Sequence, residues 1–137
     1  MGKKPIQGYR ENFARLQVFG TIADFDTITK ALGVKPYRTH RKKDRMTRVS
    51  PPYGYDAWIF KAPVPRNRAL EHHLRWLHRR FIKKTRYLKR LTRIHDVHLY
   101  CSYHSNYDQG RLELPPEVLA WCGEVGIPIH ISILVQE

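Results

Sequence analysis

The chain has 137 residues, of which 42% are hydrophobic and 12% aromatic, so it can bury the core of one domain and is not a disordered basic tail. Its 25 Lys and Arg against 12 Asp and Glu give a net charge of +13, which favours an anionic partner such as nucleic acid or an acidic protein. No apolar run is long enough for a signal peptide or a membrane span, so we expect a cytoplasmic protein with no membrane partner.

The sequence contains no motif with the residue spacing of a known catalytic, metal-binding or phosphate-binding site. Two cysteines, Cys101 and Cys122, are too few for a disulfide framework or a four-thiolate zinc site, and we expect a reducing compartment. His98 and His104 are separated by roughly 20 Å along one expected strand, which is too far for one ion. No HExxH motif, phosphate-binding glycine loop or GxSxG motif occurs. We therefore predict no metal, no cofactor and no catalytic residue, and leave open whether His98, His104 or His130 has a chemical role.

The N-terminal half predicts three extended segments and a helix. Residues 1–12 are expected to form a loose basic arm, and residues 13–137 a single α/β domain. Residues 13–20 alternate in polarity and predict a strand. Asp24 is placed to cap a helix that ends at Gly33. Residues 34–40 are expected to be extended, residues 41–54 to form a loop or hairpin, and residues 55–62 to form a central strand covered on both faces.

The C-terminal half predicts a long amphipathic helix from about Arg66, with a break or kink near residues 83–85 because Lys84 falls on its apolar side. Residues 96–104 alternate and predict a strand, and residues 105–110 predict a turn. Pro115 and Pro116 favour the start of a helix that buries Val118, Leu119 and Cys122 and ends before Gly126. Residues 129–135 complete the pattern as a strand.

The order β α β β α β α β predicts an α+β fold. We expect a two-layer α/β sandwich with a mainly antiparallel sheet and helices on one side, in which a ferredoxin-like βαββαβ order is followed by an extra αβ unit.

Positive charge is concentrated in one part of the chain. Residues 35–93 carry 19 Lys and Arg against three acidic residues, a net charge of +16 that suggests one positive surface. On the predicted long helix, basic side chains lie opposite the apolar stripe, and Glu71 is the only acidic residue between positions 66 and 95. A solvated helix normally mixes both signs, so we interpret these side chains as an anion-binding surface, with a merely solvated face as the alternative. This helix ridge comprises Arg68, His72, Arg75, Arg79, Lys83, Arg86 and Arg90.

A second group of basic residues lies before the predicted central strand. This loop cluster comprises Arg38, His40, Arg41, Lys42, Lys43, Arg45, Arg48 and Tyr53. Its cations would neutralise phosphates, and the nearby tyrosines at 37, 53 and 55 would either stack on unpaired bases or pack at the core edge. We expect the helix ridge to carry more affinity, because side chains on a rigid helix lose less freedom on binding.

The segments Ile28-Thr-Lys-Ala-Leu-Gly-Val-Lys-Pro and Thr39-His-Arg-Lys resemble the opening signature of the family catalogued as domain of unknown function 4279. Trp58 on a middle strand and Leu112-Glu-Leu-Pro-Pro-Glu-Val-Leu before a closing apolar strand are similar to the rest of that family's order. The resemblance implies a small bacterial α/β domain, suspected of defence or immunity roles, with no established reaction. Lys43-Asp44 stands where a glycine commonly follows, and the helix is unusually basic; both departures favour an anionic partner.

The sequence therefore predicts a non-enzymatic nucleic-acid-binding domain that prefers RNA or single strands, because no helix-turn-helix or zinc-finger spacing appears. One alternative is a protein-binding immunity or accessory subunit that docks on an acidic partner. A second alternative is a metal-independent ribonuclease. The choice between RNA and DNA and the oligomeric state stay open.

Overall fold

The computed structural model describes residues 11–105 and 111–135. The first ten residues of the predicted arm and residues 106–110 of the predicted turn at 105–110 lie outside this range, and Ser105 is the last residue of a strand. The strands are β1 (Phe13–Gly20), β2 (Arg38–His40), β3 (Asp56–Lys61), β4 (Asp96–Ser105) and β5 (Ile129–Val135). The helices are α1 (Phe25–Leu32), α2 (Leu70–Phe81), α3 (Thr85–Ile94) and α4 (Pro116–Val125), and a 3-10 turn, η1 (Ile82–Lys84), joins α2 to α3.

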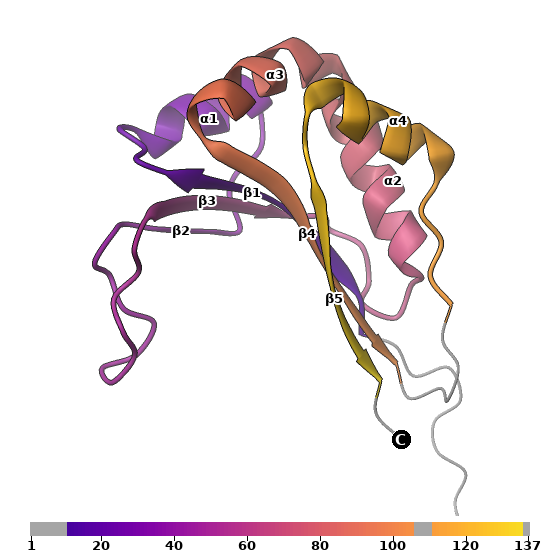
Figure 1. Ribbon diagram of the computed structural model, residues 1–137, viewed down its shortest axis with the longest axis horizontal. Coiled ribbons are helices and arrows are strands. Elements are labelled where there is room, and N and C mark those ends of the chain that lie inside the picture. Colours follow the sequence, from indigo (N-terminus) through magenta and orange to yellow (C-terminus); the bar gives the residue numbers. More distant parts are fainter. Residues whose placement is uncertain (1–10, 106–110, 136–137) are drawn as a thin grey trace, which may run out of the picture.

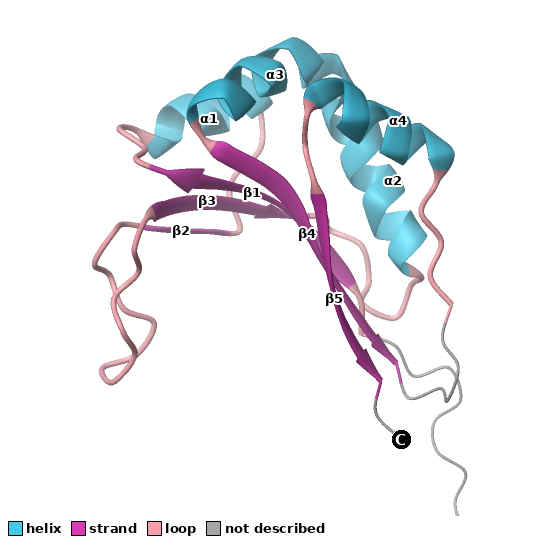
Figure 2. Ribbon diagram, in the orientation of Figure 1, coloured by secondary structure: helices cyan, strands magenta, loops and turns pink. Residues whose placement is uncertain are grey.

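One five-stranded sheet forms the first layer, in the order β2-β3-β1-β4-β5. Neighbouring strands are antiparallel except for β4 and β5, which are parallel. The helices lie together on one face of this sheet, as Figures 1 and 2 show. The predicted α+β class, with a mainly antiparallel sheet and helices on one side, is confirmed. Each helix of the described residues is too short or too polar to cross a bilayer.

The core lies between the sheet and the helices. Alternate residues of β1, among them Leu16 and Val18, are fully buried against fully buried helix residues such as Leu74 and Leu77. Two tryptophan N–H groups are satisfied within this packing. Trp58 Nε1 donates to Thr29 Oγ1 at 3.0 Å, and Trp121 Nε1 donates to Thr85 Oγ1 at 3.0 Å. These bonds tie α1 to β3 and α4 to α3.

Local sequence signals set most element boundaries. Strand β1 has the predicted bounds, and α1 begins after Asp24, whose side chain accepts a hydrogen bond from the backbone N–H of Asp26 at 2.9 Å. Gly33 ends α1 with φ of 72°, as predicted, because a residue without Cβ adopts this conformation at little cost. These boundaries depend on nearest neighbours along the chain.

The predicted central strand is confirmed, because β3 lies between β2 and β1 and is buried on both faces. One prediction that depends on distant contacts was wrong. Leu119 was expected to be buried and is 45% exposed. Trp121 and Val125 fill the buried positions of α4 instead, because they follow Val118 at a spacing of three and seven residues.

The predicted long helix is two helices. Residues before Leu70 are not helical, so Arg68 precedes α2, contrary to the expectation of a helix from about Arg66. The predicted break is confirmed by η1 at Ile82–Lys84, after which the chain changes direction (Figure 1). The hydroxyl of Thr85 donates to the carbonyl of Ile82 at 2.6 Å and stabilises the turn. This break keeps the charged end of Lys84 out of the core.

Both cysteines lie in the core. Burial raises the pKa of the Cys101 thiol to about 12 and that of the Cys122 thiol to about 11. Both side chains are therefore neutral and pack as small apolar groups.

Gly20, at the end of β1, lies against the imidazole of His95. Its φ is 153°, and a Cβ at this position would be 2.8 Å from His95 Nδ1. A side chain here would both strain the backbone and displace the ring.

We predict that Gly20→Ala lowers the free energy of unfolding by about 2 kcal/mol or more, measured by urea denaturation. Gly54→Ala is the matched control, because a Cβ at Gly54 has no atom within 4 Å. Equal stabilities of the two variants would contradict the proposed close contact.

Three buried histidines make the fold sensitive to acid. His40, His73 and His98 are at most 9% exposed, and burial lowers the pKa of each. A lowered pKa means that the unfolded chain takes up the proton first as the pH falls. The stability these groups give is therefore complete above about pH 6.5 and is lost as the pH falls toward their folded pKa values.

We predict that Tm falls by several degrees between pH 7.5 and pH 5, measured by calorimetry. His73→Leu keeps an apolar side chain at this fully buried position and removes one proton-binding group, so its Tm should fall less over the same interval. A flat Tm profile of the unmodified protein would rule out this acid sensitivity.

Candidate nucleic-acid interface

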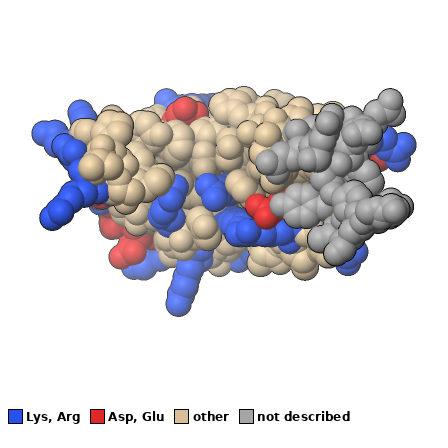
Figure 3. Space-filling model, turned by 90° about the horizontal axis from the view of Figure 1, so that it is seen from below, with Lys and Arg blue, Asp and Glu red and all other residues tan. Residues whose placement is uncertain are grey.

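The face of the sheet opposite the helices is not covered by any helix of the described residues (Figure 1). Side chains of all five strands reach it, since residues alternate between the two faces of a strand. Figure 3 views this side and shows Lys and Arg across its middle and at the end that bears the 41–54 loop. The open face carries Phe13, Arg15, Gln17, Phe19, Arg38, His40, Ile59, Lys61, His98, Tyr100, Ser102, His130 and Ser132.

Two cations face each other across the open face. Arg15 of β1 is directly paired in register with Lys61 of β3. Both lie over the same two rings: the Arg15 guanidinium is 4.5 Å from the ring centre of Phe13 and 5.1 Å from that of Tyr37, and Lys61 Nζ is 5.3 and 5.2 Å from them. Like charges directly opposite on neighbouring strands destabilise a sheet. The repulsion between Arg15 and Lys61 therefore destabilises the sheet unless an anion binds between them.

The surroundings of Arg15 strengthen that conclusion. Its Nε is buried and has no hydrogen-bond partner in the described part of the chain. Burial lowers the pKa of the Arg15 guanidinium and the charge of nearby Arg38 also lowers it, whereas Tyr37, which shares a side-chain hydrogen bond with Arg15, acts in the opposite direction. Within the described residues no carboxylate pairs with Arg15, Arg38 or Lys61. A phosphate would supply an acceptor for Arg15 Nε and a negative charge beside the three cations.

A row of touching rings crosses the same face from β2 to β5. Successive centre-to-centre distances are 5.7 Å from His40 to Tyr55, 4.5 Å from Tyr55 to Phe19, 4.9 Å from Phe19 to His98, and 4.7 Å from His98 to His130. This ring row follows the order of the strands. Tyr55 and His130 are its exposed rings, on which unpaired bases could stack, whereas His40 and His98 are buried and Phe19 meets His98 edge to face.

His98, in the middle of the ring row, is held by neighbours on both ring nitrogens. Its Nδ1 is 3.1 Å from Asp96 Oδ1, and its Nε2 is 2.9 Å from Gln17 Nε2. Burial lowers its pKa despite Asp96, so the ring is neutral at pH 7. His98 is thus a fixed and buried member of the ring row. Among the described residues, no group of three or more His, Cys, Asp or Glu is arranged to hold a metal ion.

The loop cluster is anchored by the buried carboxylate of Asp56. This group accepts hydrogen bonds from the backbone N–H of Lys42 at 2.7 Å and of Ile22 at 2.9 Å, and from the Arg41 guanidinium at 3.3 Å. These bonds, led by the one from Lys42, lower the pKa of Asp56. Arg41 also donates to the carbonyls of Ile22 and Ala23. Arg41 therefore fixes the loop and is not a free cation.

The remaining members of the loop cluster differ in whether their side chains are free to bind an anion. Arg45 donates to the carbonyl of Ser50 at 3.1 Å within the loop. The side chains of Arg38, Lys42, Lys43 and Arg48 are exposed, and no acidic side chain of the described residues pairs with them. His40 stacks on Tyr53 at 3.6 Å, beside a pocket of about 410 Å³ that Arg38 and Arg45 also line. This part of the cluster continues the open face.

The helix ridge lies on the other layer of the molecule. Its residues are carried by α2, η1, α3 and the segment before α2, and these helices cover the opposite face of the sheet (Figure 1). Arg75 is paired with Glu71 at 3.1 Å and with Glu117 of α4 at 3.0 Å, so it joins two helices. His72, Arg79, Lys83, Arg86 and Arg90 are exposed. The expected single positive surface is therefore divided between two sides.

Arg15, Lys61 and Phe13 were missing from the predicted site, and Tyr37 was named only as a tyrosine near the loop cluster. One signal was present in the sequence: the strand face opposite the core carries aromatic and basic residues, such as Phe13 and Arg15, where small polar ones are usual. The pairing of Arg15 with Lys61, 46 positions later, depends on strand register and was not accessible from local pattern.

We predict that Asp56→Asn lowers the free energy of unfolding by about 1 to 3 kcal/mol at pH 7, because the Arg41 guanidinium loses its charged partner. The folded pKa of Asp56 is lowered, so its contribution is complete above about pH 4 and is lost as the pH falls through the folded value. Urea denaturation at pH 7 and pH 3 should show the difference from the unmodified protein shrinking in acid. Asp26→Asn, at an exposed position on α1, is the control, and an equally small effect of both changes would refute the anchoring role.

Comparison with known proteins gives one match. Residues 9–136 match the family described as Domain of unknown function (DUF4279), which covers nearly the whole chain. No curated protein and no solved structure matches. The resemblance seen in residues 28–36 and 39–42 is thereby confirmed, and the chain belongs to the DUF4279 family.

Proposed function

We propose that the protein binds single-stranded nucleic acid, RNA or DNA, on the open face of its sheet, and that it does so without catalysis. The observation that carries this proposal is the pair of facing cations, Arg15 and Lys61, between the rings of Phe13 and Tyr37. The pair is unfavourable in the free protein, and a phosphodiester would relieve it.

The two kinds of side chain on the open face suit the two parts of a single strand. Arg15, Lys61 and Arg38 would neutralise successive phosphates. Tyr37 is 53% exposed and Tyr55 is 38% exposed, so both offer a ring to an unpaired base. Bases within a duplex are stacked on each other and are not available to such rings, which supports a preference for single strands.

The strand order supports a more specific description of the fold. The first four strands lie in the order β2-β3-β1-β4 with antiparallel neighbours, and β5 adds a parallel strand beside β4. We infer a ferredoxin-like βαββαβ unit followed by an extra αβ unit. Four-stranded sheets of RNA-recognition modules present stacking aromatics on an open face, and the same physical solution would operate here.

The test compares three variants that each lose two positive charges. They are Arg15→Gln with Lys61→Gln on the open face, Lys42→Gln with Arg48→Gln in the loop cluster, and Arg79→Gln with Arg86→Gln on the helix ridge. Binding of fluorescein-labelled 12-mer oligo(U) is measured by anisotropy at several salt concentrations. The open-face variant should bind at least about tenfold more weakly, and its log K against log salt should be flatter by about 1.4 units, since each single-strand phosphate contact contributes about 0.7.

Each outcome has a clear meaning for the proposal. The helix-ridge variant should lose the least affinity, and thermal melts show whether each variant is folded. A larger loss of affinity in the helix-ridge variant than in the open-face variant would show that the nucleic acid binds to the helix ridge instead. The absence of binding to any oligonucleotide at about 50 mM salt would refute the function and favour an acidic protein partner.

A further inference from the structure

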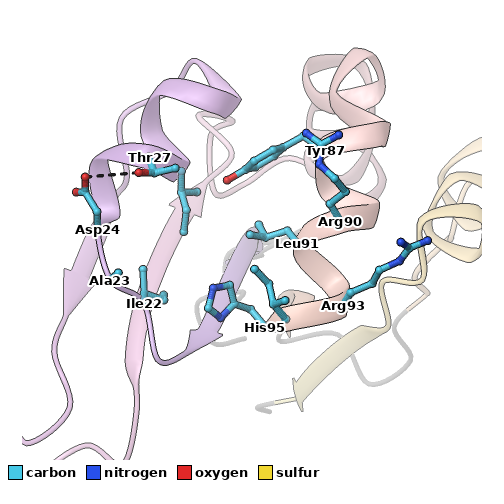
Figure 4. A pocket seen from close by; sticks show the side chains of 11 residues that line it. Ile22, Ala23, Asp24, Thr27, Tyr87, Arg90, Leu91, Arg93 and His95 are labelled. Atoms are coloured by element: carbon cyan, nitrogen blue, oxygen red, sulfur yellow. Dashed lines mark hydrogen bonds between the residues drawn. The ribbon is translucent and has the colours of Figure 1, made fainter.

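We propose a second binding site that takes a small apolar carboxylate, in a pocket between α1 and α3. The pocket has a volume of about 560 Å³, within the range of sites for small organic ligands. Figure 4 shows it between the start of α1 on one side and the length of α3 on the other. It lies on the helical layer, so this inference does not depend on nucleic-acid binding.

The walls of the pocket are mostly apolar. Ile22 and Ile28 line it from the α1 side, and Leu91 and Ile94 line it from the α3 side. Ile94 is 73% exposed, although it belongs to this otherwise buried apolar group. An apolar ligand would cover Ile94 and gain the free energy of removing this surface from water.

Polar groups from α3 lie at the same pocket. The ring of Tyr87 extends from α3 toward α1, and Arg90 lies beside it, with its guanidinium 5.9 Å from the ring centre. Arg90 is exposed and forms no ion pair with an acidic side chain of the described residues. The imidazole of His95 also lines the pocket and lies between Ile22 and Leu91 (Figure 4).

The charge at the pocket selects an anion. Asp24 is the one acidic residue among those that line it, and its carboxylate accepts hydrogen bonds from the backbone of Asp26 at 2.9 Å and from the hydroxyl of Thr27 at 3.5 Å. That carboxylate is therefore committed to the start of α1. Arg90 remains as an unpaired positive charge next to an apolar cavity, and an apolar body with one carboxylate complements both features.

The test uses decanoate as the probe, with decanol as its neutral counterpart. Methyl groups of the isoleucines are observed by NMR during titration. Decanoate should shift the signals of Ile22, Ile28 and Ile94 saturably and leave that of Ile133 on β5 unchanged. Decanol should bind about tenfold more weakly, because it lacks the charge-assisted contact to Arg90.

Two variants separate the charge from the cavity. Arg90→Gln should reduce the affinity for decanoate to that for decanol, whereas Arg86→Gln, on the same helix outside the pocket, should leave it unchanged. Ala23→Trp at an exposed lining position should fill the cavity and abolish both titrations. Equal binding of decanoate and decanol would overturn the anionic class, and the absence of saturable shifts at the three isoleucines up to about 5 mM would overturn the site.

Discussion

The cross-strand pair of Arg15 and Lys61 is the interaction on which the functional account depends. Antiparallel pairing of β1 with β3 places the two cations opposite each other, and both rest on Phe13 and Tyr37. Stability alone would favour an opposite charge at one of the two positions. Natural sequences depart from such local rules mainly where function requires it, so this conflict distinguishes the open face from an ordinary solvated sheet face.

The rest of the structure supports this face and leaves it free of helices in the described part of the chain. The helices pack against the other side of the sheet, so the side chains of the open face are not needed to form the hydrophobic core between the two layers. Asp56 attaches the loop cluster to the start of α1 through Arg41 and the N–H of Ile22, and this holds the loop at the end of the ring row. Rigid support of this kind reduces the freedom that a binding surface loses when a ligand arrives.

Prediction from sequence succeeded where the physics is local. The cap residues Asp24 and Gly33 act on neighbouring backbone groups, and alternation along β1 and β4 is visible in any short window. Even the break after Phe81 could be anticipated, because Lys84 does not suit the apolar stripe of a continuous helix. Two features that required contacts between distant segments were missed: the exposure of Leu119 and the ion pair of Arg75 with Glu117. The concentration of positive charge in residues 35–93 also did not correspond to a single positive surface, because the fold distributes those residues over both layers.

The most direct test of the central claim is the effect of Lys61→Glu on stability and binding in the same buffer. If Arg15 and Lys61 face each other for the sake of an anionic ligand, the change should raise Tm of the free protein, because an opposite charge now faces Arg15. It should also weaken oligo(U) binding by more than about tenfold, because a phosphate would meet a carboxylate. A lowered Tm in the correctly folded variant, or unchanged binding, would contradict the account.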